Sequence, residues 1–181
     1  AALTPTVALA DPPPSNQPLL EEYYYIRKAL QPHANLIEGP LEEIIAKSPD
    51  AIVMGDRSLE TADNTVVLDN WINAGGALVR FAGPRLASRS DAFTPTPLRP
   101  AARALGGALA WDQPQAIAAF PMNSPFADLA PPDDARVRRQ VLAQPSPDLA
   151  SQTWAKLEDG TPLVTARQQG RGAMILFHVT A

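Results

Sequence analysis

The chain has 181 residues, of which 45 % are hydrophobic and 19 % are charged, so it can build one domain with a core and is not globally disordered. Its net charge of −4 argues against a nucleic-acid partner, because nucleic-acid binding needs a basic face. It has no cysteine and two histidines, which excludes thiol nucleophiles, disulfides and metal centres built from cysteine or several histidines. We therefore predict no metal site and no cofactor.

The first part of the chain alternates short apolar runs with amphipathic segments. In chain order, it predicts a strand over 6–10, a helix over 19–30, a strand over 34–38, a short helix over 41–48 and a strand over 50–56. Such alternation is typical of βαβ units, whose strands form a mostly parallel sheet. No apolar run approaches the roughly 20 residues of a membrane-spanning helix, so we do not expect this segment itself to span a membrane.

A helix, a glycine stop and a buried strand are predicted over residues 64–85. The helix is indicated by four apolar residues at helical spacing, namely Val67, Leu68, Trp71 and Ile72. The Gly75-Gly76 pair ends it, since glycine adopts a left-handed conformation without a Cβ penalty. A short apolar strand over 77–82 follows, and Gly83-Pro84 forms a tight turn after it. Ligands of open α/β sheets bind at the carboxyl ends of the strands, so we expect a small-molecule site to include this turn.

The pattern changes after Ser88. Residues 89–135 are predicted to be a proline-rich irregular connection. Within this connection, we expect a helical turn at 103–105 and short strands at 108–111 and 117–120.

Residues 136–181 are predicted to be rich in β structure. An Asp-Gly pair at 159–160 is typical of the turn of a hairpin, and a strongly apolar strand is expected over 173–179. We therefore divide the chain into an α/β core over 1–88, the connection over 89–135, and this hairpin segment, which completes or flanks the same domain.

Two stretches carry a resemblance to a known family. DAIVMGDRS, followed by LDNWINAGGALVRFAGPRLA, resembles the core of class I glutamine-amidotransferase-like domains. The run GGALVRFAGPRLA, with WAKLEDGTPLVTARQQGRGAMILFHVTA further on, looks like the soluble domain of bacterial membrane proteins of the BatA-like type. The resemblance implies a flavodoxin-like, mostly parallel sheet with helices on both faces, plus a β-rich C-terminal portion with antiparallel hairpins. It also implies that the chain is a piece of a membrane-anchored protein on the periplasmic side of the inner membrane.

The chain departs from this family at the reactive position. Active amidotransferases place a cysteine in a turn of the form Gly-x-Cys-x-Gly, and aligning its last glycine with Gly83 puts Phe81 in place of the cysteine and Val79 in place of the first glycine. Phenylalanine cannot attack a carbonyl, and no cysteine elsewhere replaces it. We therefore predict a non-catalytic domain that acts as a binding or assembly module, with a protein partner or the rest of the parent protein.

The candidate ligand-binding residues are strand-end residues, namely Asp11, Asp56, Arg80, Gly83 and Arg85. Arg80 lies inside an apolar strand, where an isolated charge is costly. With Arg85, it either holds an anionic ligand or a partner's carboxylate in a crevice, or forms an internal ion pair to Asp56 or Asp11. The two aspartates either bind a cation or act as acid and base, or cap a helix and fix a loop.

Two further functions stay open. One is a hydrolase or small-ligand-binding enzyme that uses Asp11, Asp56 and Arg80, whose side chains must then converge in one pocket. A serine–histidine–aspartate site with His178 has little support, because none of the candidate serines Ser58, Ser88 and Ser124 lies in a Gly-x-Ser-x-Gly turn. The other is oligomerisation through an exposed strand edge of the C-terminal portion.

Overall fold

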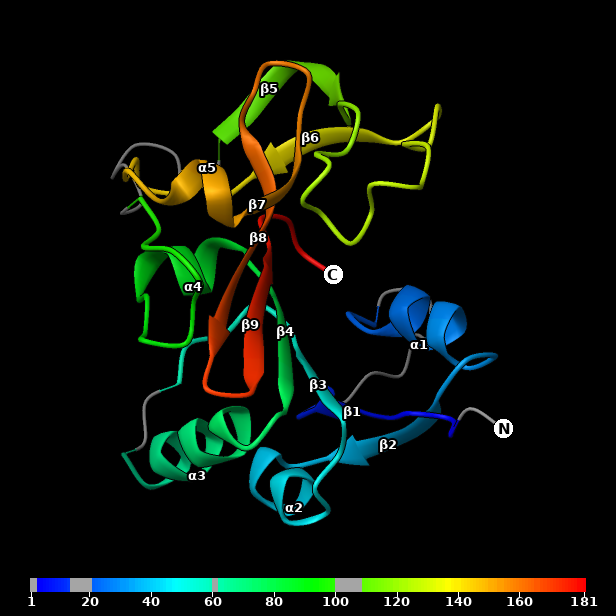
Figure 1. Cartoon of the computed structure of the whole chain (residues 1–181), viewed down its shortest axis with the longest axis vertical. Helices are drawn as coiled ribbons and strands as arrows, with labels where there is room; N and C mark the ends of the chain where they lie inside the picture. The colour runs from blue at the N-terminus through cyan, green and yellow to red at the C-terminus, as the bar shows by residue number, and fades with distance from the viewer. Residues whose placement is uncertain (1–2, 14–20, 60–61, 100–108) are drawn as a thin grey trace.

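The centre of the molecule is a seven-stranded sheet with the strand order β2-β1-β3-β4-β9-β8-β7 (Figure 1). The structure is a computed structural model that describes residues 3–13, 21–59, 62–99 and 109–181. The strands of this sheet are β1 (Thr6–Ala10), β2 (Asn35–Gly39), β3 (Ala51–Met54), β4 (Ala77–Phe81), β7 (Thr153–Lys156), β8 (Pro162–Gln169) and β9 (Gly172–Phe177). Neighbouring strands from β2 to β9 in this order are parallel, and β8 is antiparallel to both β9 and β7. The predicted α/β class with a mostly parallel sheet is confirmed.

Short helices connect the strands. They are α1 (Tyr24–Leu30), α2 (Leu41–Ala46), α3 (Ala62–Asn73), α4 (Pro84–Ser88) and α5 (Leu149–Gln152). The first predicted helix begins later than expected, because residues 21–23 form a turn, and part of its expected span lies outside the described residues. The short helix α4 was not predicted. Its proline stands at the first helical position, where the missing N–H costs no hydrogen bond, so Gly83-Pro84 starts a helix as well as ending a strand.

Helix α3 packs on the sheet through a narrower stripe than the sequence predicts. Leu68, Trp71 and Ile72 are buried, and the Trp71 indole donates a hydrogen bond of 3.1 Å to the carbonyl of Pro49. Val67 is 50 % exposed, so three of the four apolar residues that indicated the helix face the core. Only the side of α3 that faces the sheet is buried, and Val67 lies outside that side. The turn after α3 needs Gly76, since a Cβ there would come within 2.3 Å of the Trp71 ring.

Two clusters of buried residues pack the helices against the parallel strands. In the first, α2 and α3 pack against Ala8 and Ile52 of β1 and β3, with Leu78 of β4 and Met174 of β9. In the second, Tyr23 and the residues of α1 pack against other positions of the same strands, namely Val7, Leu9 and Val53. Fully burying each large aliphatic side chain contributes about 1.5–3 kcal/mol, so these contacts hold the helices on the sheet.

Strand β9 connects the N-terminal strands and the C-terminal strands into one sheet. Strand β9 lies between β4 and β8, with Phe81 paired to Phe177 in the parallel register. The predicted hairpin at the Asp-Gly turn is present as β7 and β8. The hairpin segment therefore extends the sheet that the first 88 residues begin.

A second, two-stranded sheet is formed by β5 (Leu109–Ala116) and β6 (Arg136–Gln140) at one end of the molecule, with α2 and α3 at the other (Figure 1). The strand expected over 117–120 was wrong, because β5 ends before it and only Ile117 makes an isolated bridge, to Leu157. The helical turn expected at 103–105 lies outside the described residues.

Candidate functional site

The predicted site residues follow the carboxyl ends of adjacent parallel strands. Asp11 comes directly after β1, Asp56 two residues after β3, and Gly83 two residues after β4. Since β1, β3 and β4 are neighbours in the sheet, these residues lie along one edge, where open α/β sheets bind ligands. The contacts of each side chain decide whether this edge of the sheet is a reactive site.

Asp56 holds the start of α4 against the end of β3. Its Oδ1 accepts hydrogen bonds of 2.9 Å from the backbone N–H of Gly83 and of Leu86, and its Oδ2 accepts one of 3.1 Å from Arg85. These are donors that a helix start leaves without intrahelical partners, so Asp56 caps a helix from a neighbouring strand. Gly83 lies so close that a Cβ would come within 2.4 Å of the carboxylate.

Asp11 is also engaged in internal contacts. Its Oδ1 accepts a hydrogen bond of 3.3 Å from the N–H of Leu41 at the start of α2, and its Oδ2 is ion-paired with Arg57. Its backbone has a positive φ of 46°, which aspartate tolerates better than most residues. Asp11 therefore ties the end of β1 to α2 and to the segment after β3.

Arg80 forms an internal ion pair, with Asp91 instead of Asp11 or Asp56. The guanidinium is fully buried, and its two terminal nitrogens donate to the two Asp91 oxygens at 2.6 and 3.0 Å. They also donate to the carbonyls of Phe93 at 3.0 Å and Arg57 at 2.6 Å. Sequence reasoning missed Asp91 because it stands in the irregular connection, where no periodicity indicates which way a side chain points.

Asp91 in turn fixes the connection over the strand ends. Its carboxylate also accepts hydrogen bonds of 2.9 Å from the N–H of Leu59 and from that of Phe93. Phe93 is buried in the core cluster under α2 and α3. The segment after Ser88 is thus closed onto the sheet and occupies the space beside Arg80.

Tyr23 fills the edge between β1 and β3. Its hydroxyl donates to the carbonyl of Ala10 and accepts from the N–H of Gly55, both at 2.8 Å. Burial raises the pKa of Tyr23 to about 12, so the phenol stays protonated. The Glu22 carboxylate accepts a hydrogen bond of 2.7 Å from the backbone N–H of Asp56, so Glu22 is also held by an internal contact.

Phe81 is the last residue of β4 and lies in the middle of the sheet. Its ring stacks on Phe177 of β9, with centroids 4.8 Å apart and planes at 15°. A strand-to-helix turn follows Phe81 at Ala82 and Gly83, and the Phe81 ring pairs with a ring of the neighbouring strand.

The His178 ring is hydrogen-bonded to Thr165 and to the carbonyl of Val141, not to a candidate serine. Its Nδ1 is 2.8 Å from the carbonyl of Val141, which can only accept, so Nδ1 carries the proton and Nε2 accepts from Thr165 Oγ1 at 3.0 Å. Burial lowers the pKa of His178 to about 4, so the ring is neutral at pH 7. Ser124 accepts a turn hydrogen bond from the N–H of Phe126 at 3.0 Å. Among the described residues, the one hydroxyl bonded to His178 is that of Thr165, and both side chains are fully buried, so a substrate cannot reach this pair.

An arginine-rich pocket lies next to this edge. It has a volume of about 300 Å³ and is lined by Arg57, Ser58, Arg85, Ser88 and Arg89, which we call the arginine pocket. Of the predicted site residues, only Arg85 contributes to it. Within the described ranges, no group of three or more acidic or histidine side chains is placed to bind a metal ion.

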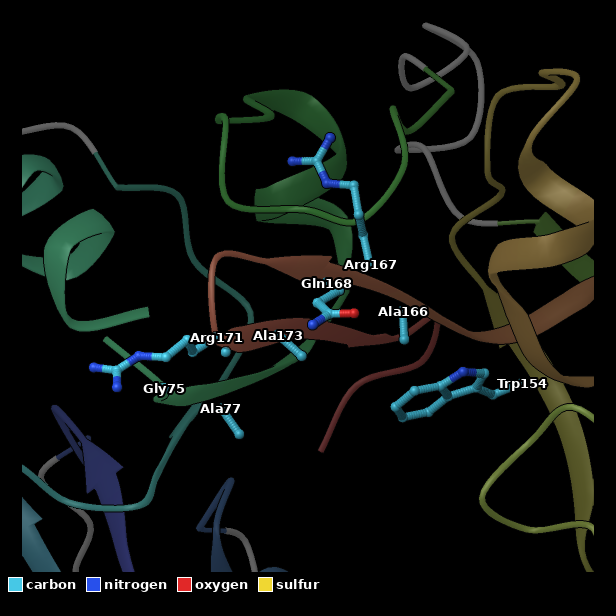
Figure 2. A pocket seen from close by; sticks show the side chains of 9 residues that line it. Gly75, Ala77, Trp154, Ala166, Arg167, Gln168, Arg171 and Ala173 are labelled. Atoms are coloured by element: carbon cyan, nitrogen blue, oxygen red, sulfur yellow. The ribbon is translucent and has the colours of Figure 1, made fainter. Parts of the chain in front are cut away.

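A larger pocket than the arginine pocket lies at the other end of the strands. It has a volume of about 500 Å³ and is lined by the first residues of β4 and β9, with Trp154 facing them (Figure 2). Figure 2 shows the side chains of Arg167 and Arg171 directed away from it. Because ligands of α/β sheets bind at carboxyl ends and this pocket lacks convergent polar groups, we do not assign the site to it.

Comparisons with known proteins show the fold alone. No protein-family model matches the sequence, and no curated protein matches it significantly. The structure is similar to cytoplasmic protein STM3548 from Salmonella typhimurium, with a TM-score of 0.68 and 9 % identity over 97 % of this chain and 87 % of that one. It is equally similar to cytoplasmic protein STM1381 from Salmonella typhimurium LT2, with a TM-score of 0.67 and 11 % identity over the same shares. A β-galactosidase from Bacillus circulans sp. alkalophilus matches at a TM-score of 0.58 and 12 % identity, and the chain spans 28 % of that enzyme's length.

These comparisons correct the expected location. Both Salmonella proteins are named as cytoplasmic, which overturns the prediction of a membrane-anchored, periplasmic protein. That prediction came only from the resemblance of short sequence phrases to a membrane-anchored family. Among the described helices, none has the length and apolar character needed to cross a membrane.

Proposed function

We propose that this chain is a non-catalytic, glutamine-amidotransferase-like domain that acts as a binding or assembly module for another protein or a ligand. Its core is of the flavodoxin-like class, with helices on both faces of the sheet. The order β2-β1-β3-β4-β9 supports this class, since flavodoxin-like sheets have the order 2-1-3-4-5. The alternation of Val7 and Leu9 with Ala8 along β1 supports helices on both faces, because these residues belong to different core clusters.

The observation that carries the proposal is the internal engagement of the strand-end side chains. Asp56 caps α4, Asp11 pairs with Arg57, and Arg80 pairs with Asp91. A general acid or base must reach its substrate within hydrogen-bond distance, and a carboxylate held by several internal donors is poorly suited to that role. The same contacts make the edge rigid, which suits a surface that recognises a partner.

A hydrolase that uses Asp11, Asp56 and Arg80 needs these three side chains to converge on one cavity. In the part of the chain that the structure describes, Asp11 lines a pocket with Arg57, whereas Arg80 is fully buried under the connection. No contact described above favours this alternative, so we keep the binding module as the proposal.

The proposal is tested by assays for hydrolysis on the purified chain. We expect no ammonia release from glutamine and no ester hydrolysis above buffer. Phe81→Cys should also release no ammonia, because the buried His178 bonds Thr165 and is not placed as its base. Phe177→Cys is the matched control, since it removes the other ring of the same stack.

Two results would contradict the proposal. The first is ammonia release by Phe81→Cys that exceeds that of Phe177→Cys, which would reveal a working glutaminase site around the turn. The second is hydrolysis by the unchanged chain that Asp11→Asn or Asp56→Asn abolishes while circular dichroism shows an intact fold.

A further inference from the structure

The arginine pocket concentrates positive charge in a chain whose net charge is −4. Three guanidinium groups and two serine hydroxyls line it, and no acidic side chain is among its lining residues. Arginines that line one cavity repel each other, so their clustering favours an anion between them. Its position beyond the carboxyl ends of β3 and β4 is the usual one for a ligand of an α/β sheet.

The two walls of the pocket are held in fixed relation. Arg57 and Ser58 come from the segment after β3, whereas Arg85, Ser88 and Arg89 come from α4 and its end. Asp56 joins these walls, because it stands beside Arg57 in the chain and accepts three N–H groups at the start of α4. A site whose walls are locked by such contacts needs little reorganisation on binding.

The charges of the pocket are only partly offset. The guanidinium of Arg57 pairs with Asp11. Arg89 has a contact of its own. Within the described residues, the side chains of Arg85 and Ser58 have no hydrogen-bond partner, so both can donate to a ligand. The Ser88 hydroxyl donates to the carbonyl of Arg85 at 2.8 Å and steadies the end of the short helix.

We propose that the arginine pocket binds the phosphoryl group of a small phosphate monoester. A guanidinium presents paired N–H groups that match phosphate oxygens, and the three acceptor oxygens and near-double charge of a phosphoryl group suit several arginines better than a carboxylate does. The volume of about 300 Å³ is at the small end of the range for small-molecule sites, which suits a short ester body. This inference rests on the proposed function, since it names the ligand class of the binding module.

The test is a titration of the purified chain with glycerol 3-phosphate, followed by phosphorus and backbone-amide NMR. We expect shifts at the amides of residues 57–58 and 85–89, and about tenfold weaker binding in Arg85→Gln. Arg138→Gln is the matched control, because it removes the same charge from an exposed position on β6 and should bind as the unchanged chain does. Binding should strengthen from about pH 5 to about pH 7, because the second ionisation of the phosphoryl group lies near pH 6.

Each other outcome refutes a named part of the inference. No amide shifts in the pocket, or equal weakening by Arg138→Gln, overturns the site. Equal affinity for acetate at matched ionic strength overturns the phosphoryl assignment. Release of inorganic phosphate in the same spectra overturns the non-catalytic proposal instead, and leaves the phosphoryl site standing.

Discussion

Removing the charge of Asp91 should be among the most damaging single changes in the domain. Arg80 is 0 % exposed, and the Asp91 side chain is 9 % exposed, so Asp91→Asn leaves a buried guanidinium with two carbonyl partners and no counter-charge. Breaking one partner of a buried ion pair costs about 3–5 kcal/mol. For a chain of this length, that corresponds to a fall in melting temperature of about 6–20 °C.

Urea unfolding followed by circular dichroism measures this loss. Asp133→Asn removes the same charge from an exposed loop position and should change the free energy of unfolding by less than about 0.5 kcal/mol. Arg80→Met removes the other partner, and the double variant should be at least about 1 kcal/mol more stable than the two single losses predict together. A loss below about 1 kcal/mol in Asp91→Asn, or strict additivity in the double variant, would refute the assignment of this ion pair as the anchor of the connection.

Three further changes test other contacts of the strand edge. Tyr23→Phe should cost about 2 kcal/mol in urea unfolding, because it leaves a buried N–H and a buried carbonyl unpaired, whereas Tyr25→Phe, on a ring that is 72 % exposed, should cost almost nothing. Asp56→Ala should cost about 2 kcal/mol and speed amide exchange at the start of α4; unchanged exchange would contradict its capping role. Since the pKa of His178 falls from 6.5 to about 4 on folding, the unfolded chain takes up the proton first, and stability should fall by about 3 kcal/mol between about pH 6.5 and pH 4. His178→Gln should flatten this profile and His33→Gln should not; equal profiles would refute the burial argument.

Local patterns predicted most of the secondary structure. The spacing of apolar residues indicates a strand or a helix directly. The bounds of the parallel strands were therefore predicted to within one or two residues. The secondary-structure prediction was incomplete where one sequence pattern is compatible with two structures. Gly83-Pro84 is both a strand end and a helix start, and Val67 is apolar although it faces solvent.

The candidate site was predicted less completely than the fold. The sequence indicated the edge along which Asp11, Asp56 and Gly83 lie, because parallel strands bring their carboxyl ends together. It did not indicate Asp91, which reaches Arg80 from a connection without periodicity. Nor did it single out Arg89, whose place in the arginine pocket depends on a helix that the sequence did not reveal.

By itself, the sequence determined the α/β class, the alternation of strands and helices as far as β4, and the exclusion of any thiol nucleophile. Only the tertiary structure decided that β9 lies between β4 and β8, that Arg80 pairs with Asp91, and that arginines from two elements line one pocket. The reason is physical. Periodicity indicates which face of a helix or strand is buried. Strand neighbours and side-chain partners that are distant in sequence depend on the path of crossovers and loops, which no local pattern encodes.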